Sequence, residues 1–155
     1  MDIYKLLNDL NIEYEEIEHE RVTTIEEAKH IKNMIEGQGC KNLFLTDHKK
    51  NYYIYVLEED KKANLKELSK ILNCSHLSFA SIEDLSSILN LSVGSVTPLA
   101  IINDKDNKVE ILLDKDLINK KLLFHPNVNT KTISIMYNDL LKIIKKCNHK
   151  VTIID

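Results

Sequence analysis

Gly39-Cys40-Lys41-Asn42-Leu43-Phe44-Leu45 is the stretch of this chain that decides its fold. From Asn42 onward it reads as an apolar strand, and with residues 52–57 beyond a polar turn it predicts a β-hairpin. Lys41 then stands at the mouth of that strand, just after a glycine-flanked turn. A lysine in this place can hold its ammonium over a cleft and bind a phosphate or carbonyl oxygen as a point charge.

A second segment, Gly94-Ser95-Val96-Thr97-Pro98, is a G-x-x-x-P loop. Glycine permits positive φ, and proline stiffens the exit of the loop while removing one donor. The loop is either an ordinary helix-to-strand turn or a set of backbone N–H donors for a carbonyl oxygen. A lysine plus a donor loop, with no evident nucleophile–base pair, suggests a site that positions a substrate and stabilises its developing charge.

Length and composition place the chain among soluble globular proteins. Its 155 residues fit one domain (1–155), with 43% hydrophobic and 29% charged residues. No apolar run approaches the roughly 20 residues that span a bilayer. The N-terminus begins a helical pattern at once and lacks the features of a signal peptide. A cytoplasmic protein with no membrane partner is expected.

The charge balance argues against bulk electrostatic binding of nucleic acid, and against a DNA partner. The net charge is −3, and 20 of the 21 basic residues are lysines, Arg21 being the exception. Bidentate arginine contacts to bases or phosphates are therefore scarce. RNA contact through a local lysine patch would be modest and salt-sensitive. Lys62, Lys66 and Lys70, at i, i+4 and i+8, predict either a solvated helix face or such a patch.

The three cysteines Cys40, Cys74 and Cys147 have no C-x-x-C spacing, which predicts reduced thiols rather than disulfides. The pair Cys74-Ser75-His76 is a weak metal motif, because no second ligand pair lies at zinc spacing. Cys40 beside Lys41 offers an alternative as a nucleophile, but it has no recognisable partner base.

Helices and hairpins are interspersed along the chain, which predicts a mixed α/β (α+β) domain with a central mixed, mostly antiparallel sheet flanked by helices. Helices are expected after Asp2, at the capping box Thr24-Ile25-Glu26-Glu27, after Asn64, after Ser81 and over 138–147. A second hairpin is expected from 99–102 and 109–113, joined by the turn 103–107. Further strands are expected at 12–17, 77–80, 122–125, 132–135 and 151–154.

His125, in Phe124-His125-Pro126, lies at the end of a predicted strand next to the second of two prolines. A lone histidine is usually structural or merely exposed. The other five histidines form no triad-like or H-x-x-x-H arrangement, and none of them is assigned a role.

Taken together, these segments resemble the YbaK/prolyl-tRNA-synthetase-associated family of aminoacyl-tRNA deacylases, most closely the free-standing branch that edits alanyl-tRNA(Pro). The resemblance runs from residue 12 to about residue 144, and its order and spacing are more specific than any one motif. It rests on His19 with 23–28, Lys41-Asn42-Leu43-Phe44-Leu45, Gly94-Ser95-Val96-Thr97-Pro98-Leu99, Leu113-Asp114-Lys115-Asp116-Leu117, and Phe124-His125-Pro126 with Asn129-Thr130.

The resemblance implies a cleft for the aminoacylated end of tRNA and hydrolysis of its ester by water, assisted by the 2′-hydroxyl of the terminal ribose. It gives Lys41 the role of orienting the terminal phosphate and ester, and Gly94 that of a backbone donor to the ester carbonyl. It makes the rest of the loop part of the binding site (Ser95, Val96, Thr97 and Pro98). Asn42 and His125 would line the pocket. No metal or organic cofactor is implied.

The leading hypothesis is a trans-editing hydrolase acting on mischarged Ala-tRNA(Pro). Hydrolysis of another mischarged tRNA, such as Cys-tRNA(Pro), is an alternative in the same class. A non-catalytic module that binds aminoacyl-tRNA or a synthetase is an alternative in another class. The charge of −3 leaves open whether the tRNA is held by this chain alone or with the help of prolyl-tRNA synthetase.

Overall fold

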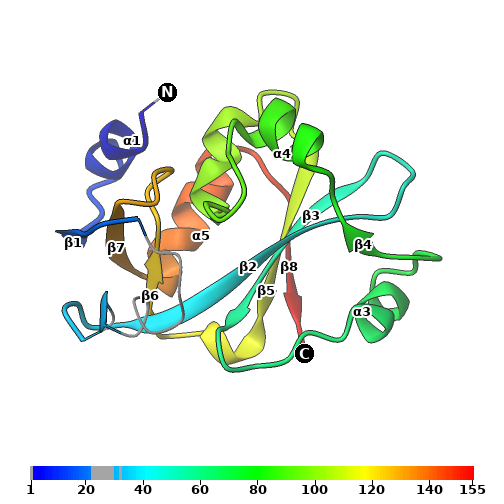
Figure 1. Ribbon diagram of the computed structural model, residues 1–155, viewed down its shortest axis with the longest axis horizontal. Coiled ribbons are helices and arrows are strands. Elements are labelled where there is room, and N and C mark those ends of the chain that lie inside the picture. The colour runs from blue at the N-terminus through cyan, green and yellow to red at the C-terminus, as the bar shows by residue number, and fades with distance from the viewer. Residues whose placement is uncertain (1, 22–29, 32) are drawn as a thin grey trace.

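The computed structural model describes residues 2–21, 30–31 and 33–155. The predicted capping box Thr24-Ile25-Glu26-Glu27 lies outside these residues. Within them the predicted mixed α/β (α+β) fold is confirmed, with helices packed on both faces of a mixed sheet (Figure 1). No helix of the described part combines the length and the apolar character needed to cross a bilayer.

The helices begin where the sequence places a capping side chain. Asp2, Asn64 and Ser81 each accept a hydrogen bond from a backbone N–H of the first turn that follows. The predicted lysine stripe is only partly helical, because Lys62 precedes Asn64 and so lies before the helix. The helices are α1 (Ile3–Asp9), α3 (Leu65–Ile71), α4 (Ile82–Leu89) and α5 (Tyr137–Lys146), with short 3₁₀ helices η1 (Pro98–Asn103) and η2 (Lys115–Leu117).

The strands form one sheet in the order β1-β7-β6-β2-β3-β5-β8, with β4 paired to β2 off this path. Four pairings are antiparallel (β1·β7, β6·β7, β2·β3 and β2·β4) and three are parallel (β2·β6, β3·β5 and β5·β8). The strands are β1 (Glu15–Glu18), β2 (Gln38–Thr46), β3 (Tyr52–Glu58), β4 (Ser78–Phe79), β5 (Val109–Asp114), β6 (Lys121–Phe124), β7 (Lys131–Met136) and β8 (Val151–Ile154).

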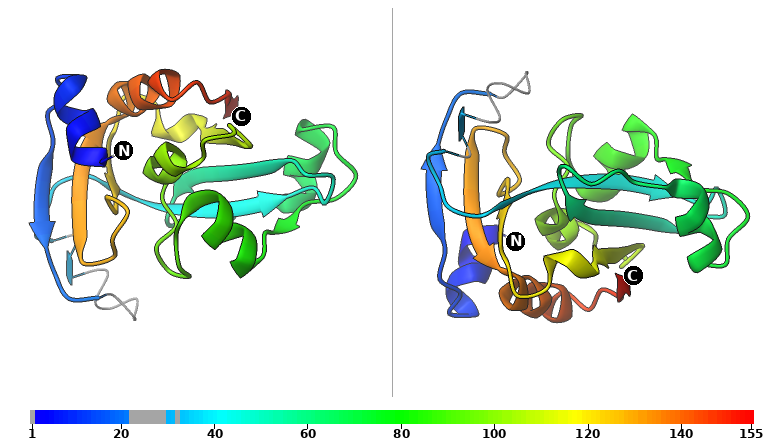
Figure 2. Two further views of the ribbon diagram at one scale, coloured as in Figure 1. Left: turned by 90° about the horizontal axis from the view of Figure 1, so that it is seen from above. Right: turned by 90° about the horizontal axis from the view of Figure 1, so that it is seen from below.

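The two faces of the β2–β3 hairpin bury different apolar clusters. Phe44, Ile54 and Val56 face the larger cluster, which α1, α4, η1 and α5 cover. Leu45 and Leu57 face the smaller cluster, which α3 covers through Leu68. Figure 2 shows α3 and α4 on opposite sides of β2 and β3. Because side chains alternate between faces, a register slip of one residue would exchange the two clusters, and so the register is fixed.

The second predicted hairpin is wrong, because residues 98–103 form the 3₁₀ helix η1 instead of a strand. Thr97 caps this helix with its side chain, and Pro98 occupies its first turn, where the fixed φ of proline suits a helix. Pro98 to Ile101 are all buried, without the alternation of a half-buried strand. A short apolar run of this kind cannot be assigned to helix or strand by its pattern alone.

Strand β2 exchanges partners along one of its edges. At its start, Gln38 and Gly39 pair with Leu122 and Leu123 of β6. At its end, β4 pairs with Leu45 and Thr46, and Ala80 N donates to Phe44 O. Between these pairings, Lys41 to Leu43 have no strand partner on this edge within the described residues. We call this opening, residues 41–43 of β2, the β2 gap.

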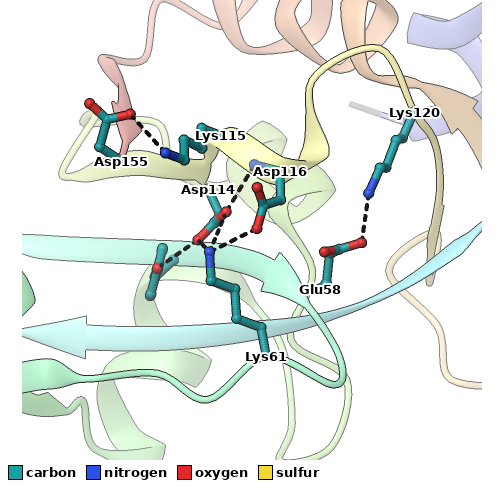
Figure 3. A network of polar contacts seen from close by, with 8 residues as sticks. Glu58, Lys61, Asp114, Lys115, Asp116, Lys120 and Asp155 are labelled. Atoms are coloured by element: carbon teal, nitrogen blue, oxygen red, sulfur yellow. Dashed lines mark hydrogen bonds and ion pairs between the residues drawn. The ribbon is translucent and has the colours of Figure 1, made fainter.

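A carboxylate at the end of β5 ties three segments together (Figure 3). Asp114 is 1% exposed and accepts hydrogen bonds from the Tyr55 hydroxyl (3.2 Å), the Lys61 ammonium (3.0 Å) and Asp116 N (2.9 Å). Burial, together with the nearby Asp114 charge, raises the pKa of Tyr55 to about 12. The phenol therefore stays protonated and donates, and the network links β3, β5 and η2.

Replacing Asp114 by alanine should lower the free energy of unfolding by about 2–3 kcal/mol, because it leaves the Tyr55 hydroxyl without its acceptor inside the protein. Urea denaturation of Asp114→Ala measures the loss. The matched control is Lys115→Ala, which removes an exposed pair with Asp155 at 3.7 Å and should cost at most about 1 kcal/mol. An equal loss in both variants would contradict the role given to Asp114.

Candidate functional site

Lys41 and Asn42 lie in the β2 gap but face opposite sides of the sheet. Lys41 pairs with Leu57 of β3, so its side chain lies on the face of the smaller cluster. It is half-buried, and within the described part of the chain its ammonium forms no ion pair. Asn42 faces the other way, toward the loop of residues 94–98. Among the residues that the structure describes, Lys41 is thus a positive charge without a counter-ion, in the stretch of β2 that has no strand partner on one edge.

Asn42 fixes the G-x-x-x-P loop to the sheet. Its Nδ2 donates to Val96 O at 3.2 Å, and its Oδ1 is buried without a partner among the described residues. The orientation of the amide follows from this contact, because a flipped amide would place its oxygen against the Val96 carbonyl. Asn42, which the sequence predicts to line the pocket, thus forms a direct hydrogen bond between strand β2 and the loop. The two bonded residues are 54 positions apart in the sequence.

The loop has the conformation that its glycine and proline predict. Gly94 has φ +88°, and a Cβ built there would meet no atom within 4 Å, so the glycine is required by the backbone and not by crowding. Ser95 is buried, and its N–H donates to Ser92 O at 3.2 Å. Thr97 and Pro98 are buried where the loop enters η1. The loop is therefore held at both ends.

Three backbone donors of the loop remain unused. The N–H groups of Gly94, Val96 and Thr97 have no acceptor in the part of the chain that the structure describes. Unpaired backbone N–H groups are uncommon where burial excludes water. Backbone donors grouped in one fixed loop are an arrangement that can bind a carbonyl oxygen or an oxyanion.

A pocket of about 200 Å³ adjoins this loop. Asn42, Gly94 and Val96 line one part of it. The other part includes the apolar side chains Phe79, Ile82 and Val93, which are more than half exposed although they are large. Exposed apolar side chains that gather around positioned polar groups are typical of a ligand site. The sequence interpretation missed these three residues, because nothing in a single sequence marks which strand or helix residues stay exposed.

His125 follows Phe124, the last residue of β6. The His125 Nδ1 lies 2.9 Å from Lys131 O. Burial lowers the pKa of His125, and the nearby His19 lowers it further, while the Lys131 carbonyl opposes this shift. His125 is therefore a neutral imidazole at pH 7.

The predicted residues thus form two groups. Asn42 and the loop 94–98 meet on the face of the larger cluster, whereas the Lys41 side chain lies on the other face and His125 lies beyond the end of β6. Among the described residues, no strand pairs with the β2 gap on the edge that lies between the first two. Cys40 belongs to neither, since its side chain packs against the larger cluster and its thiol donates to Gln38 O at 3.5 Å.

The described residues contain no group of three or more His, Cys, Asp or Glu side chains placed to hold a metal ion. Cys74-Ser75-His76 has no third ligand among them, although the His76 ring stacks on that of His48 at 5.5 Å. What the arrangement supplies is a positive charge, backbone donors, a neutral imidazole and an apolar pocket.

Comparison with known proteins identifies relatives over most of the chain. A sequence model of the aminoacyl-tRNA editing domain matches residues 19–143. The prolyl-tRNA editing protein ProX of Acetoanaerobium sticklandii is 40% identical over 141 residues, which cover 90% of this chain and 86% of ProX. The prolyl-tRNA synthetase associated domain-containing protein 1 of Danio rerio is 33% identical over 156 residues, which cover 99% of this chain and 85% of that protein.

Solved structures share the fold. A candidate trans-editing enzyme for prolyl-tRNA synthetase superposes with a TM-score of 0.71 at 16% identity, covering 97% of this chain and 94% of the other. At this identity the likeness supports the fold alone, whereas the sequence matches support the family. The chain therefore belongs to the aminoacyl-tRNA editing domain family, as its motifs predict.

Proposed function

We propose that this protein is a trans-editing deacylase that hydrolyses the ester of mischarged aminoacyl-tRNA, with Ala-tRNA(Pro) as its substrate. The observation that carries the proposal is the loop of residues 94–97, which presents three unused backbone donors and is fixed by Asn42 beside the β2 gap. The name of the relative ProX, a prolyl-tRNA editing protein, supports the same reaction class.

In the proposed reaction the oxygen of a water molecule attacks the ester carbonyl. The carbonyl oxygen becomes an oxyanion, which accepts hydrogen bonds from the N–H groups of Gly94 and its neighbours. The bond between the carbonyl carbon and the ribose oxygen then breaks, and that oxygen takes up a proton. The products are the free amino acid and a tRNA with an intact terminal ribose. The Lys41 ammonium orients the terminal phosphate and ester as a point charge.

Such a site selects by fit and positioning, since it does not rest on a strong protein base. A synthetase pocket built for proline discriminates against the smaller alanine by only about 1–3 kcal/mol. A second site that admits the small product provides the remaining selectivity. Cys-tRNA(Pro) is the alternative substrate within this class, and prolyl-tRNA synthetase is a partner that would deliver either one.

Lys41→Ala should reduce kcat/KM for Ala-tRNA(Pro) by about 100-fold, the effect of one lost electrostatic contact in the transition state. The assay is a deacylation panel of Ala-, Cys-, Ser- and Pro-tRNA(Pro). The matched control is Lys145→Ala, an exposed lysine of α5 without an ion pair among the described residues, which should retain full activity. Undiminished hydrolysis by Lys41→Ala would exclude the role of this lysine. Binding without hydrolysis of any substrate would favour a non-catalytic module.

Gly94→Ala should lower kcat at least tenfold, although the added methyl group meets no atom. The cost arises from the backbone, because a positive φ is unfavourable by about 1–2 kcal/mol for alanine, and relief of this strain turns the donors away. Asn107→Ala is the control, since Asn107 has φ +52° in a turn away from the loop. It should lose similar stability in urea and keep its activity. Equal activity of both variants would contradict the loop assignment.

Cys40→Ser should keep most of the deacylase activity, because the thiol is bonded within its own strand and packs on the apolar core. Single-turnover deacylation of Ala-tRNA(Pro) provides the measurement. Complete loss of activity in a variant that still folds would instead identify the thiol as a nucleophile.

A further inference from the structure

Two histidines flank the first residues of β7. In the order β1-β7-β6, His19 follows the end of β1 and His125 follows the end of β6. Both strands are antiparallel to β7, so their ends meet at its start, where Lys131 and Thr132 lie. The two rings are 6.0 Å apart between centroids and tilted by 57°. Residues separated by more than a hundred positions thus share one end of the sheet.

The contacts of His125 determine which of its nitrogens carries the proton. Nδ1 lies 2.9 Å from the Lys131 carbonyl oxygen, which can only accept a hydrogen bond. Nδ1 is therefore the protonated nitrogen. In the neutral ring Nε2 then keeps its lone pair, and no described residue donates to it. His125 thus presents a hydrogen-bond acceptor at Nε2.

His19 is held in the same tautomer, but both of its nitrogens are used. Nδ1 donates to Glu20 O at 2.8 Å, so Nε2 of the neutral ring accepts from the Thr132 hydroxyl, also at 2.8 Å. The His19 N–H donates to Thr130 O at 2.8 Å. His19 is therefore hydrogen-bonded to both ends of the segment 130–132. The Lys131 carbonyl in the middle of this segment orients His125.

We propose that His19 and Thr132 are positioning residues that fix the Lys131 carbonyl and so hold His125 as an Nδ1–H imidazole, whose Nε2 accepts a hydrogen bond from the substrate. The function of the acceptor rests on the proposed deacylase activity. The effect of His19 and Thr132 on the His125 tautomer does not depend on that activity, and it can be measured without any substrate.

Thr132→Val tests the positioning of His125 with an almost isosteric change. It removes only the hydroxyl that donates a hydrogen bond to His19. ¹⁵N NMR of the histidine rings should show His125 unprotonated at Nε2 in the wild type and a mixture of both tautomers in Thr132→Val. Thr132→Ser keeps the hydroxyl and should restore the wild-type spectrum. His19→Leu removes the acceptor from the other side and should act as Thr132→Val does.

Ser134→Ala is the matched control. Ser134 lies two residues along β7, is buried like Thr132, and its hydroxyl accepts a hydrogen bond from Glu15 N at 3.4 Å. A general loosening of β7 would affect both sites, whereas the proposal expects the His125 tautomer to change in Thr132→Val alone. An unchanged His125 tautomer in both Thr132→Val and His19→Leu would overturn the positioning role, whether or not the chain is a deacylase.

Deacylation kinetics test the acceptor. Thr132→Val should lower kcat/KM for Ala-tRNA(Pro) about tenfold, since small displacements of a reacting geometry are costly, and Thr132→Ser should recover it. The donor on the substrate is either the α-ammonium of the aminoacyl group or the 2′-hydroxyl of the terminal ribose. N-acetylation removes the first donor and a 2′-deoxy terminal adenosine removes the second.

Each modified substrate is compared in the wild type and in His125→Phe. The modification that slows the wild type but has no further effect in His125→Phe identifies the group that bonds to Nε2. If both modifications slow His125→Phe as strongly as the wild type, His125 accepts from neither group and the acceptor role is wrong. Loss of all deacylation in the wild type would refute the proposed function and leave the tautomer result standing.

Discussion

The exchange of partners along β2 is the constraint on which the site depends. A strand that paired with β6 over its whole length would have no free edge, and Lys41 and Asn42 would lie inside a continuous sheet. In this fold β6 pairs with only two residues of β2 before the strands part. β4 then pairs with the far end of β2. Between them, residues 41–43 have no strand partner on this edge among the described residues, and Asn42 lines the pocket of about 200 Å³ there.

Two features border this interruption. Gly39, the last residue paired with β6, leaves no room for a Cβ unless the Glu59 carboxylate moves aside. On the opposite face, Asn42 bonds to Val96 O and holds the loop 94–98 beside the gap. The buried Asn42 Oδ1 has no partner among the described residues and costs stability unless water or a ligand satisfies it. This buried acceptor next to a loop whose N–H groups have no acceptor in the described part of the chain supports a binding role for this edge.

The sequence predicts those parts of the fold that local interactions determine. The helix starts at Asp2, Asn64 and Ser81 follow from capping, and the β2–β3 hairpin follows from its pattern and polar turn. The sequence-based prediction fails for Pro98–Asn103, because the first four residues of this segment are all buried and their pattern has no periodicity that distinguishes helix from strand. The elements of the site are predicted as separate motifs. Their division between two faces of β2 depends on long-range register, which no local pattern encodes.

The same limit explains why His19 is assigned no role from sequence. Its partner Thr132 lies 113 residues away, and the strand order that joins them, β1-β7-β6, does not follow the order of the chain. Burial lowers the pKa of His125 and keeps the ring neutral, so its Nε2 can accept a hydrogen bond. The proposed roles divide accordingly, with Lys41 and the loop as donors and His125 as acceptor. A site of the proposed kind, without a strong base, acts on an ester only if its donors and acceptors are fixed before the substrate arrives. The contacts of His125 to Lys131 O and of Asn42 to Val96 O fix one acceptor and the donor loop in this way.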